Sequence, residues 1–139
     1  MANMLNKQIS AEKEHVLIAL DNLNEAMARQ EKSFIELAAI ATFINNIYNG
    51  IENILKQILR SKNVEIPTSA KWHKDLLNLS VLHEVISEEL SDSLYVYLTF
   101  RHFFVHAYGF MLEETQLKDL ADNISKVWND FLLEIKSNS

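Results

Sequence analysis

The fold is set by residues 33–60, which read SFIELAAIATFINNIYNGIENILKQILR. Their apolar side chains return every three or four positions, as on one face of an α-helix; these are Leu37, Ile40, Ile44, Ile47, Ile51, Leu55 and Ile58. Ser33 and Glu36 have the spacing of a capping box, which marks the start of a helix. Gly50 lies within the helix at a cost of about 1 kcal/mol relative to alanine. We therefore expect one long helix with a buried face, on which Gly50 allows a second helix to pack closely.

The same periodicity predicts helices on both sides of this stretch. They are expected at residues 10–29, 69–79, 81–90, 91–109 and 113–136. Ser10 can cap the first of them, and Ser91 or Asp92 can cap the fourth. Gly109 is a suitable residue to follow the end of that fourth helix. The loop between the long helix and the short ones holds the single proline, at residues 61–69.

Composition favours the same architecture. The chain has 139 residues, 48% of them hydrophobic, with two Gly, one Pro and no Cys. Such an apolar chain is not disordered, and so few turn residues do not suit an all-β fold. The lack of cysteine excludes disulfides and zinc knuckles. We predict an all-α, up-down four-helix bundle with additional short helices, formed by a single domain of residues 1–139 with a core at about residues 10–136.

The charge balance bears on partners and location. Thirteen basic and 19 acidic side chains give a formal net charge of −6, which counts against a general nucleic-acid coat. It does not exclude an enzyme that binds RNA in one local pocket. Residues 1–10 lack the features of a signal peptide, and the most apolar stretch, residues 34–44, is too short to span a bilayer. A cytoplasmic protein without membrane attachment is expected.

One segment differs from the rest of this acidic chain. Residues 100–109 read FRHFFVHAYG and bring together Arg101, His102, His106 and Tyr108. No acidic residue occurs from residue 93 to residue 112. A local site for an anion is therefore expected here.

Helix geometry limits how these residues can cooperate. His102 and His106 are one turn apart and share a face. Arg101 and His106 are separated by about 140° around the helix and about 7.5 Å along it. One helix does not bring both naturally to a single phosphate, but two copies facing each other across a twofold axis can. A homodimer is the simplest arrangement that makes the set usable.

The residue types match RNA cleavage without a metal ion or cofactor. A histidine can take a proton from the ribose 2′-hydroxyl or give one to the leaving oxygen. An arginine can bind the phosphate with two hydrogen bonds and stabilise its developing charge. The 2′-hydroxyl is then the nucleophile, which explains a preference for RNA over DNA.

Arg101, a polar residue at 102 and His106 together resemble the R-polar-x3-H motif of HEPN domains. With Tyr108, the R-x4-H-x-Y pattern resembles HepT-type toxins encoded beside minimal nucleotidyltransferase antitoxins. The resemblance implies a dimeric ribonuclease of a type VII-like toxin–antitoxin pair, with Arg101 and His106 as the catalytic pair. His102 occupies a position more often held by Asn. Tyr108 would be the hydroxyl that the antitoxin modifies with AMP, which would silence the enzyme by repelling and blocking RNA.

Other interpretations remain open. The chain could be a non-catalytic helical subunit that supports a nucleotidyltransferase. His102 and His106 could bind zinc, although the sequence offers no evident third ligand. The other three histidines, His15, His73 and His83, have no partner pattern and are expected at the surface.

Overall fold

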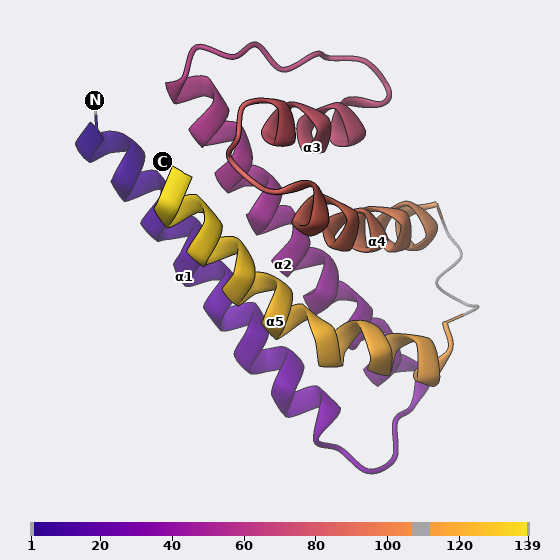
Figure 1. The fold of residues 1–139 in the computed structure, drawn as a ribbon. Coiled ribbons are helices and arrows are strands. Elements are labelled where there is room, and N and C mark those ends of the chain that lie inside the picture. The colour runs from indigo at the N-terminus through magenta and orange to yellow at the C-terminus, as the bar shows by residue number, and fades with distance from the viewer. Residues whose placement is uncertain (1, 107–111, 139) are drawn as a thin grey trace.

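A computed structural model describes residues 2–106 and 112–138 of the chain. The described residues form five α-helices and no strand (Figure 1). The helices are α1 (Ala2–Met27), α2 (Phe34–Ser61), α3 (Trp72–Leu82), α4 (Glu88–Val105) and α5 (Glu114–Asn138). The predicted all-α fold is confirmed. No helix among the described residues combines the length and apolarity needed to cross a membrane.

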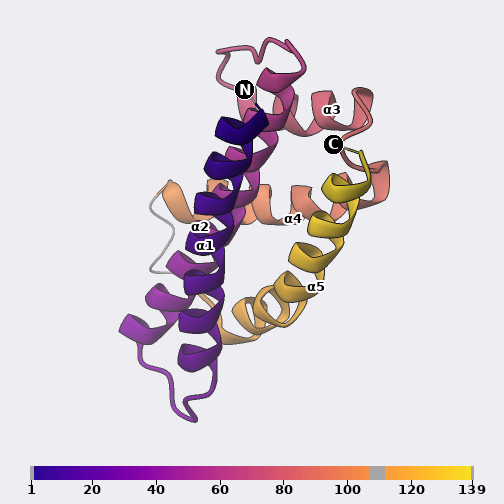
Figure 2. The ribbon, with the colours of Figure 1, turned by 90° about the vertical axis from the view of Figure 1, so that its left-hand side faces the viewer.

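Helix α2 is the centre of the molecule and contacts each of the other four helices. Helix α1 packs antiparallel along it, and α5 runs beside this pair (Figure 1). The shorter helices α3 and α4 lie crosswise to α2, which is clearest after the molecule is turned (Figure 2). The helix predicted at residues 33–60 is therefore the element on which the others assemble.

The local signals in α2 act as expected. The Ser33 hydroxyl accepts a hydrogen bond from the backbone N–H of Glu36 at 3.3 Å and caps the helix. From Ile40 onward the predicted apolar stripe is buried, with no member more than 2% exposed. A Cβ atom at Gly50 would collide with Cγ2 of Val16 on α1. The prediction that Gly50 permits close helix packing is thus confirmed.

Helix α1 starts earlier than predicted. It begins at Ala2, so Ser10 is an exposed residue inside the helix rather than its cap. Most of residues 2–9 are at least moderate helix formers, and Ile9 packs against the core, so the helix extends through them. The serine was a possible cap by residue type, but no break in helicity occurs there.

The start of α4 also differs from the prediction. The helix predicted at residues 81–90 does not form as a separate element. Helix α3 ends at Leu82, Glu84 adopts a left-handed backbone conformation with φ 59°, and α4 begins at Glu88. The cap of α4 is Ser87, whose hydroxyl accepts from the N–H of Leu90 at 3.0 Å. The predicted caps Ser91 and Asp92 therefore lie within α4, one turn too late.

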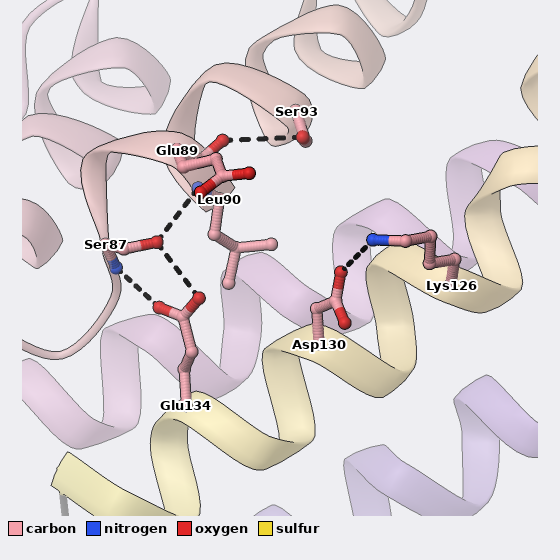
Figure 3. Close-up of polar contacts among 7 residues, drawn as sticks. All are labelled: Ser87, Glu89, Leu90, Ser93, Lys126, Asp130 and Glu134. Atoms are coloured by element: carbon pink, nitrogen blue, oxygen red, sulfur yellow. Dashed lines mark hydrogen bonds and ion pairs between the residues drawn. The ribbon is translucent and has the colours of Figure 1, made fainter.

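Contacts with α5 hold α4 in place. The Ser87 N–H and hydroxyl both donate to the carboxylate of Glu134, so that one residue caps α4 and ties it to α5 (Figure 3). Further along, the buried Tyr97 hydroxyl donates to the carbonyl of Leu120 at 2.7 Å. These contacts fix the orientation of the helix that carries the predicted site. Helix α4 ends at Val105, and the predicted stop at Gly109 lies outside the described residues.

Candidate functional site

The buried face of α4 determines where Arg101 lies. Leu90, Leu94, Tyr97 and Phe100 recur along this face, and each is at most 4% exposed. Arg101 follows them on the side of α4 that meets α2, and it is only partly exposed. Its long stem can pack against apolar neighbours while the guanidinium reaches the edge of the core.

Asn49 of α2 holds the guanidinium. Arg101 Nε donates a hydrogen bond to Asn49 Oδ1 at 3.2 Å. No other hydrogen bond from Arg101 to the described residues is present, and none of their ion pairs includes it. The guanidinium has five N–H donors, so the four on its terminal nitrogens can serve a bound anion.

The two histidines of the motif lie together on the other side of α4. The ring centroids of His102 and His106 are 4.2 Å apart, and both side chains are exposed. His106 is the C-cap residue, and its N–H donates to the carbonyl of His102 at 3.2 Å. Two imidazoles are thus available to solvent at the end of α4.

The structure pairs the histidines with each other but pairs neither with Arg101 within the described part of one chain. This separation agrees with the helix geometry, since the residues face different sides of α4. No third possible metal ligand joins the histidines among the residues described. Tyr108, the predicted modification site, lies outside the described residues.

A polar stripe on α2 was not among the predicted site residues. Asn45, Asn49 and Glu52 lie four and three residues apart on the otherwise buried side of this helix. Glu52 is 3% exposed, and both its carboxylate oxygens lie within hydrogen-bond distance of Nδ1 of His73, at 2.8 and 2.9 Å. The expectation of a surface role for His73 was therefore wrong, because a buried carboxylate needs a partner. Polar residues recurring at helical spacing in an apolar helix were the available signal.

The buried Tyr48 lies near both polar contacts of α2, that of Glu52 with His73 and that of Asn49 with Arg101. Burial raises the pKa of its hydroxyl far above the usual value, and the nearby Glu52 carboxylate raises this pKa further. The positive charge of Arg101 acts on the same pKa in the opposite direction. The Tyr48 hydroxyl therefore lies within electrostatic reach of both Glu52 and Arg101 and stays neutral.

The exposed side of α4 near the histidines carries apolar side chains. Tyr95, Val96 and Val105 are 47%, 53% and 56% exposed. Tyr95 shares a helix face with His102 and His106, which follow it by seven and eleven residues. Val96 and Val105 lie on opposite flanks of this face. An exposed face with Tyr95 and two imidazoles therefore extends along α4, with one valine on each flank.

Comparison with protein families matches residues 39–138 to the sequence model of a family described as HepT-like protein. The match extends from α2 to α5 and so includes Asn49, Arg101 and both histidines of the motif. Comparisons with curated proteins and with solved structures gave no significant match.

Proposed function

Because the chain belongs to the HepT-like protein family, we propose that it is the toxin of a type VII-like toxin–antitoxin pair and acts as a metal-independent endoribonuclease. The observation that carries this proposal is the arrangement at the end of α4. An arginine is held by its Nε, with its terminal nitrogens left for a phosphate, on a helix that also presents two exposed imidazoles. These are the groups that cleavage by a ribose hydroxyl requires.

In the proposed reaction, the 2′-oxygen attacks the adjacent phosphorus, and the bond from phosphorus to the 5′-oxygen breaks. His106 acts in proton transfer, either accepting the 2′-hydroxyl proton or donating one to the departing 5′-oxygen. The Arg101 guanidinium binds the phosphate oxygens and stabilises the added negative charge. The products are a 2′,3′-cyclic phosphate and a 5′-hydroxyl. His102 lies against His106 and can assist proton transfer or orient the second ring.

A homodimer completes this site in the proposal. Arg101 faces α2 while His106 faces solvent, so a phosphate bound by both is best placed between two copies of α4. The exposed Tyr95 on this face and the exposed Val105, one turn after Arg101, provide apolar area for such a contact. A twofold axis along this face brings the arginine of one protomer toward the histidines of its partner.

Control of the activity is proposed to act through Tyr108. The partner would be a minimal nucleotidyltransferase antitoxin that transfers AMP from ATP to the tyrosine oxygen, releasing pyrophosphate. An adenylate group two residues from His106 would add negative charge and bulk beside the RNA site. Both effects oppose binding of an RNA phosphate.

The test is cleavage of total RNA by unmodified protein in EDTA. Wild-type protein should leave 2′,3′-cyclic phosphate ends, whereas Arg101→Ala and His106→Ala should lose activity by at least about a hundredfold. His15→Ala is a matched control, because His15 is an exposed histidine on α1, away from α4. Loss of activity in EDTA, or full activity of either site variant, would refute the proposed mechanism.

The alternative function, a non-catalytic subunit of a nucleotidyltransferase complex, predicts a different result. Such a protein would bind the transferase stably but leave RNA intact before any exposure to ATP. If it is instead the toxin, modified protein should carry AMP on Tyr108. Tyr108→Phe should then remain toxic and escape the antitoxin.

A further inference from the structure

The contact between Asn49 and Arg101 joins residues that are 52 positions apart in the chain. It binds Nε, the donor nearest the flexible stem, and leaves the terminal nitrogens that can bind two phosphate oxygens side by side. An arginine fixed in this way loses less side-chain freedom when it binds a ligand than a free arginine does. The contact therefore prepares the guanidinium for an anion before the anion arrives.

The hydrogen-bond acceptor of Arg101 is an amide oxygen and not a carboxylate, which also matters for anion binding. Glu52 is the one buried carboxylate among the described residues, and it lies three positions from Asn49 on α2. Both of its oxygens are engaged by His73. Arg101 meets a neutral amide instead, and it forms no ion pair with any carboxylate of the described residues. A guanidinium without an ion-pair partner attracts phosphate more strongly than one paired with a carboxylate.

We propose that Asn49 is a positioning residue for the ribonuclease: its amide oxygen orients the Arg101 guanidinium toward the RNA phosphate without neutralising it. The inference rests on the proposed function and extends it to a residue on a different helix. Asn49 itself touches neither the scissile phosphate nor the 2′-hydroxyl in this scheme. Its effect on cleavage passes through Arg101.

Two substitutions of Asn49 distinguish its effect on the orientation of the Arg101 guanidinium from its effect on the local charge. Asn49→Ala removes the acceptor and frees the guanidinium, so kcat should fall about tenfold or more, whereas affinity for RNA should fall by less than in Asn49→Asp. Asn49→Asp keeps an acceptor oxygen but adds a negative charge beside Arg101, so affinity should fall about tenfold. Affinity is measured with an RNA oligonucleotide carrying 2′-deoxyribose at every position that could be cut, which prevents cleavage. Asn46→Ala and Asn46→Asp are matched controls on the exposed side of α2 and should stay within about twofold of wild type.

A spectroscopic measurement tests the contact without relying on catalysis. The chain has three arginines, Arg29, Arg60 and Arg101, so ¹⁵N-labelled protein gives a small set of Nε–Hε signals. Arg101→Lys identifies the signal of Arg101. This signal should exchange slowly with solvent in wild type and Asn49→Asp, and rapidly in Asn49→Ala.

The outcomes distinguish the positioning role of Asn49 from the ribonuclease activity itself. If Asn49→Ala cleaves RNA as fast as wild type while Arg101→Ala does not, the positioning role is refuted and the ribonuclease stands. If wild type does not cleave RNA, the proposed function fails, and the positioning role fails with it even where the Arg101 signal depends on Asn49. Should Asn49→Ala unfold, Asn49→Asp decides alone: a folded protein with the protected signal and unchanged RNA affinity overturns the proposal.

Discussion

Replacing Gly50 with alanine should destabilise this protein, even though alanine is the better helix former. Gly50 lies in the middle of α2, where α1 crosses closely. An added Cβ would overlap Cγ2 of Val16, which is 1% exposed. Because valine has one strongly preferred rotamer in a helix, the side chain cannot turn away easily. Helix α1 must move instead.

Two opposing contributions set the size of the change in unfolding free energy caused by Gly50→Ala. Alanine gains about 1 kcal/mol over glycine from helix propensity. Forcing an extra methyl group into a packed core costs about 1–3 kcal/mol, and a stiff, buried neighbour places this site in the upper part of that range. We therefore expect Gly50→Ala to lower the free energy of unfolding by about 1–2 kcal/mol.

Removing the methyl groups of Val16 should reverse the sign of the effect that Gly50→Ala has on stability. In a Val16→Ala background, the nearest remaining atoms to the new Cβ are Val16 Cβ at 3.9 Å and Glu12 Oε2 at 4.0 Å, which are ordinary contacts. Gly50→Ala should then raise the free energy of unfolding by about 1 kcal/mol relative to Val16→Ala alone. The difference between the two backgrounds is a coupling energy of about 2–3 kcal/mol.

Urea unfolding followed by far-ultraviolet circular dichroism measures all four proteins of this cycle at one protein concentration. Asn46→Gly compared with Asn46→Ala gives the bare propensity difference at an exposed position of the same helix. If Gly50→Ala stabilises the wild-type background as much as the Val16→Ala background, close packing against α1 is not the reason for this glycine.

Three further predictions follow from other contacts. Ser87→Ala removes the cap of α4 and should cost about 1 kcal/mol of stability in the same urea assay, with loss of helical signal from the site-bearing helix. His73→Ala leaves the carboxylate of Glu52 buried without its partner and should cost about 3 kcal/mol, whereas the double variant E52L/H73L should recover most of this loss; an equally unstable double variant would contradict the reasoning. Burial raises the pKa of Tyr48 and Tyr97 above the ordinary value of 10.0, so the folded protein retains two protons that the unfolded chain releases above about pH 10. Stability should consequently fall as pH rises beyond that point, with a contribution from the two tyrosines that approaches about 2.7 kcal/mol per pH unit. Tyr97→Phe should remove half of that contribution in urea unfolding at several pH values.

The helices could be predicted from the sequence because their signals are local. The apolar stripe of residues 33–60 and the Ser33 cap depend on positions three or four apart, and the structure confirms both. Local signals failed where several residues of suitable type competed. Ser87, Ser91 and Asp92 all have cap chemistry, and the tertiary contact of Ser87 with Glu134 favours the first of them.

The candidate site also has features that could be predicted from the sequence and features that could not. The segment around Arg101 and His106 could be picked out from the sequence, because it concentrates basic and aromatic residues in an acidic chain. The partners of Arg101 and of Glu52 could not, since Arg101 meets Asn49 across 52 positions and Glu52 meets His73 across 21. The angle at which α3 and α4 cross α2 selects these partners.

By itself, then, the sequence determined that the chain is helical, where the central helix runs, and which short segment has the chemistry of a phosphate site. The tertiary structure alone decided that this arginine is held by an amide and that the neighbouring buried carboxylate is taken by a histidine. The physical reason is range: helix propensity and amphipathic spacing act within one or two turns, whereas hydrogen bonds between helices depend on how whole helices pack.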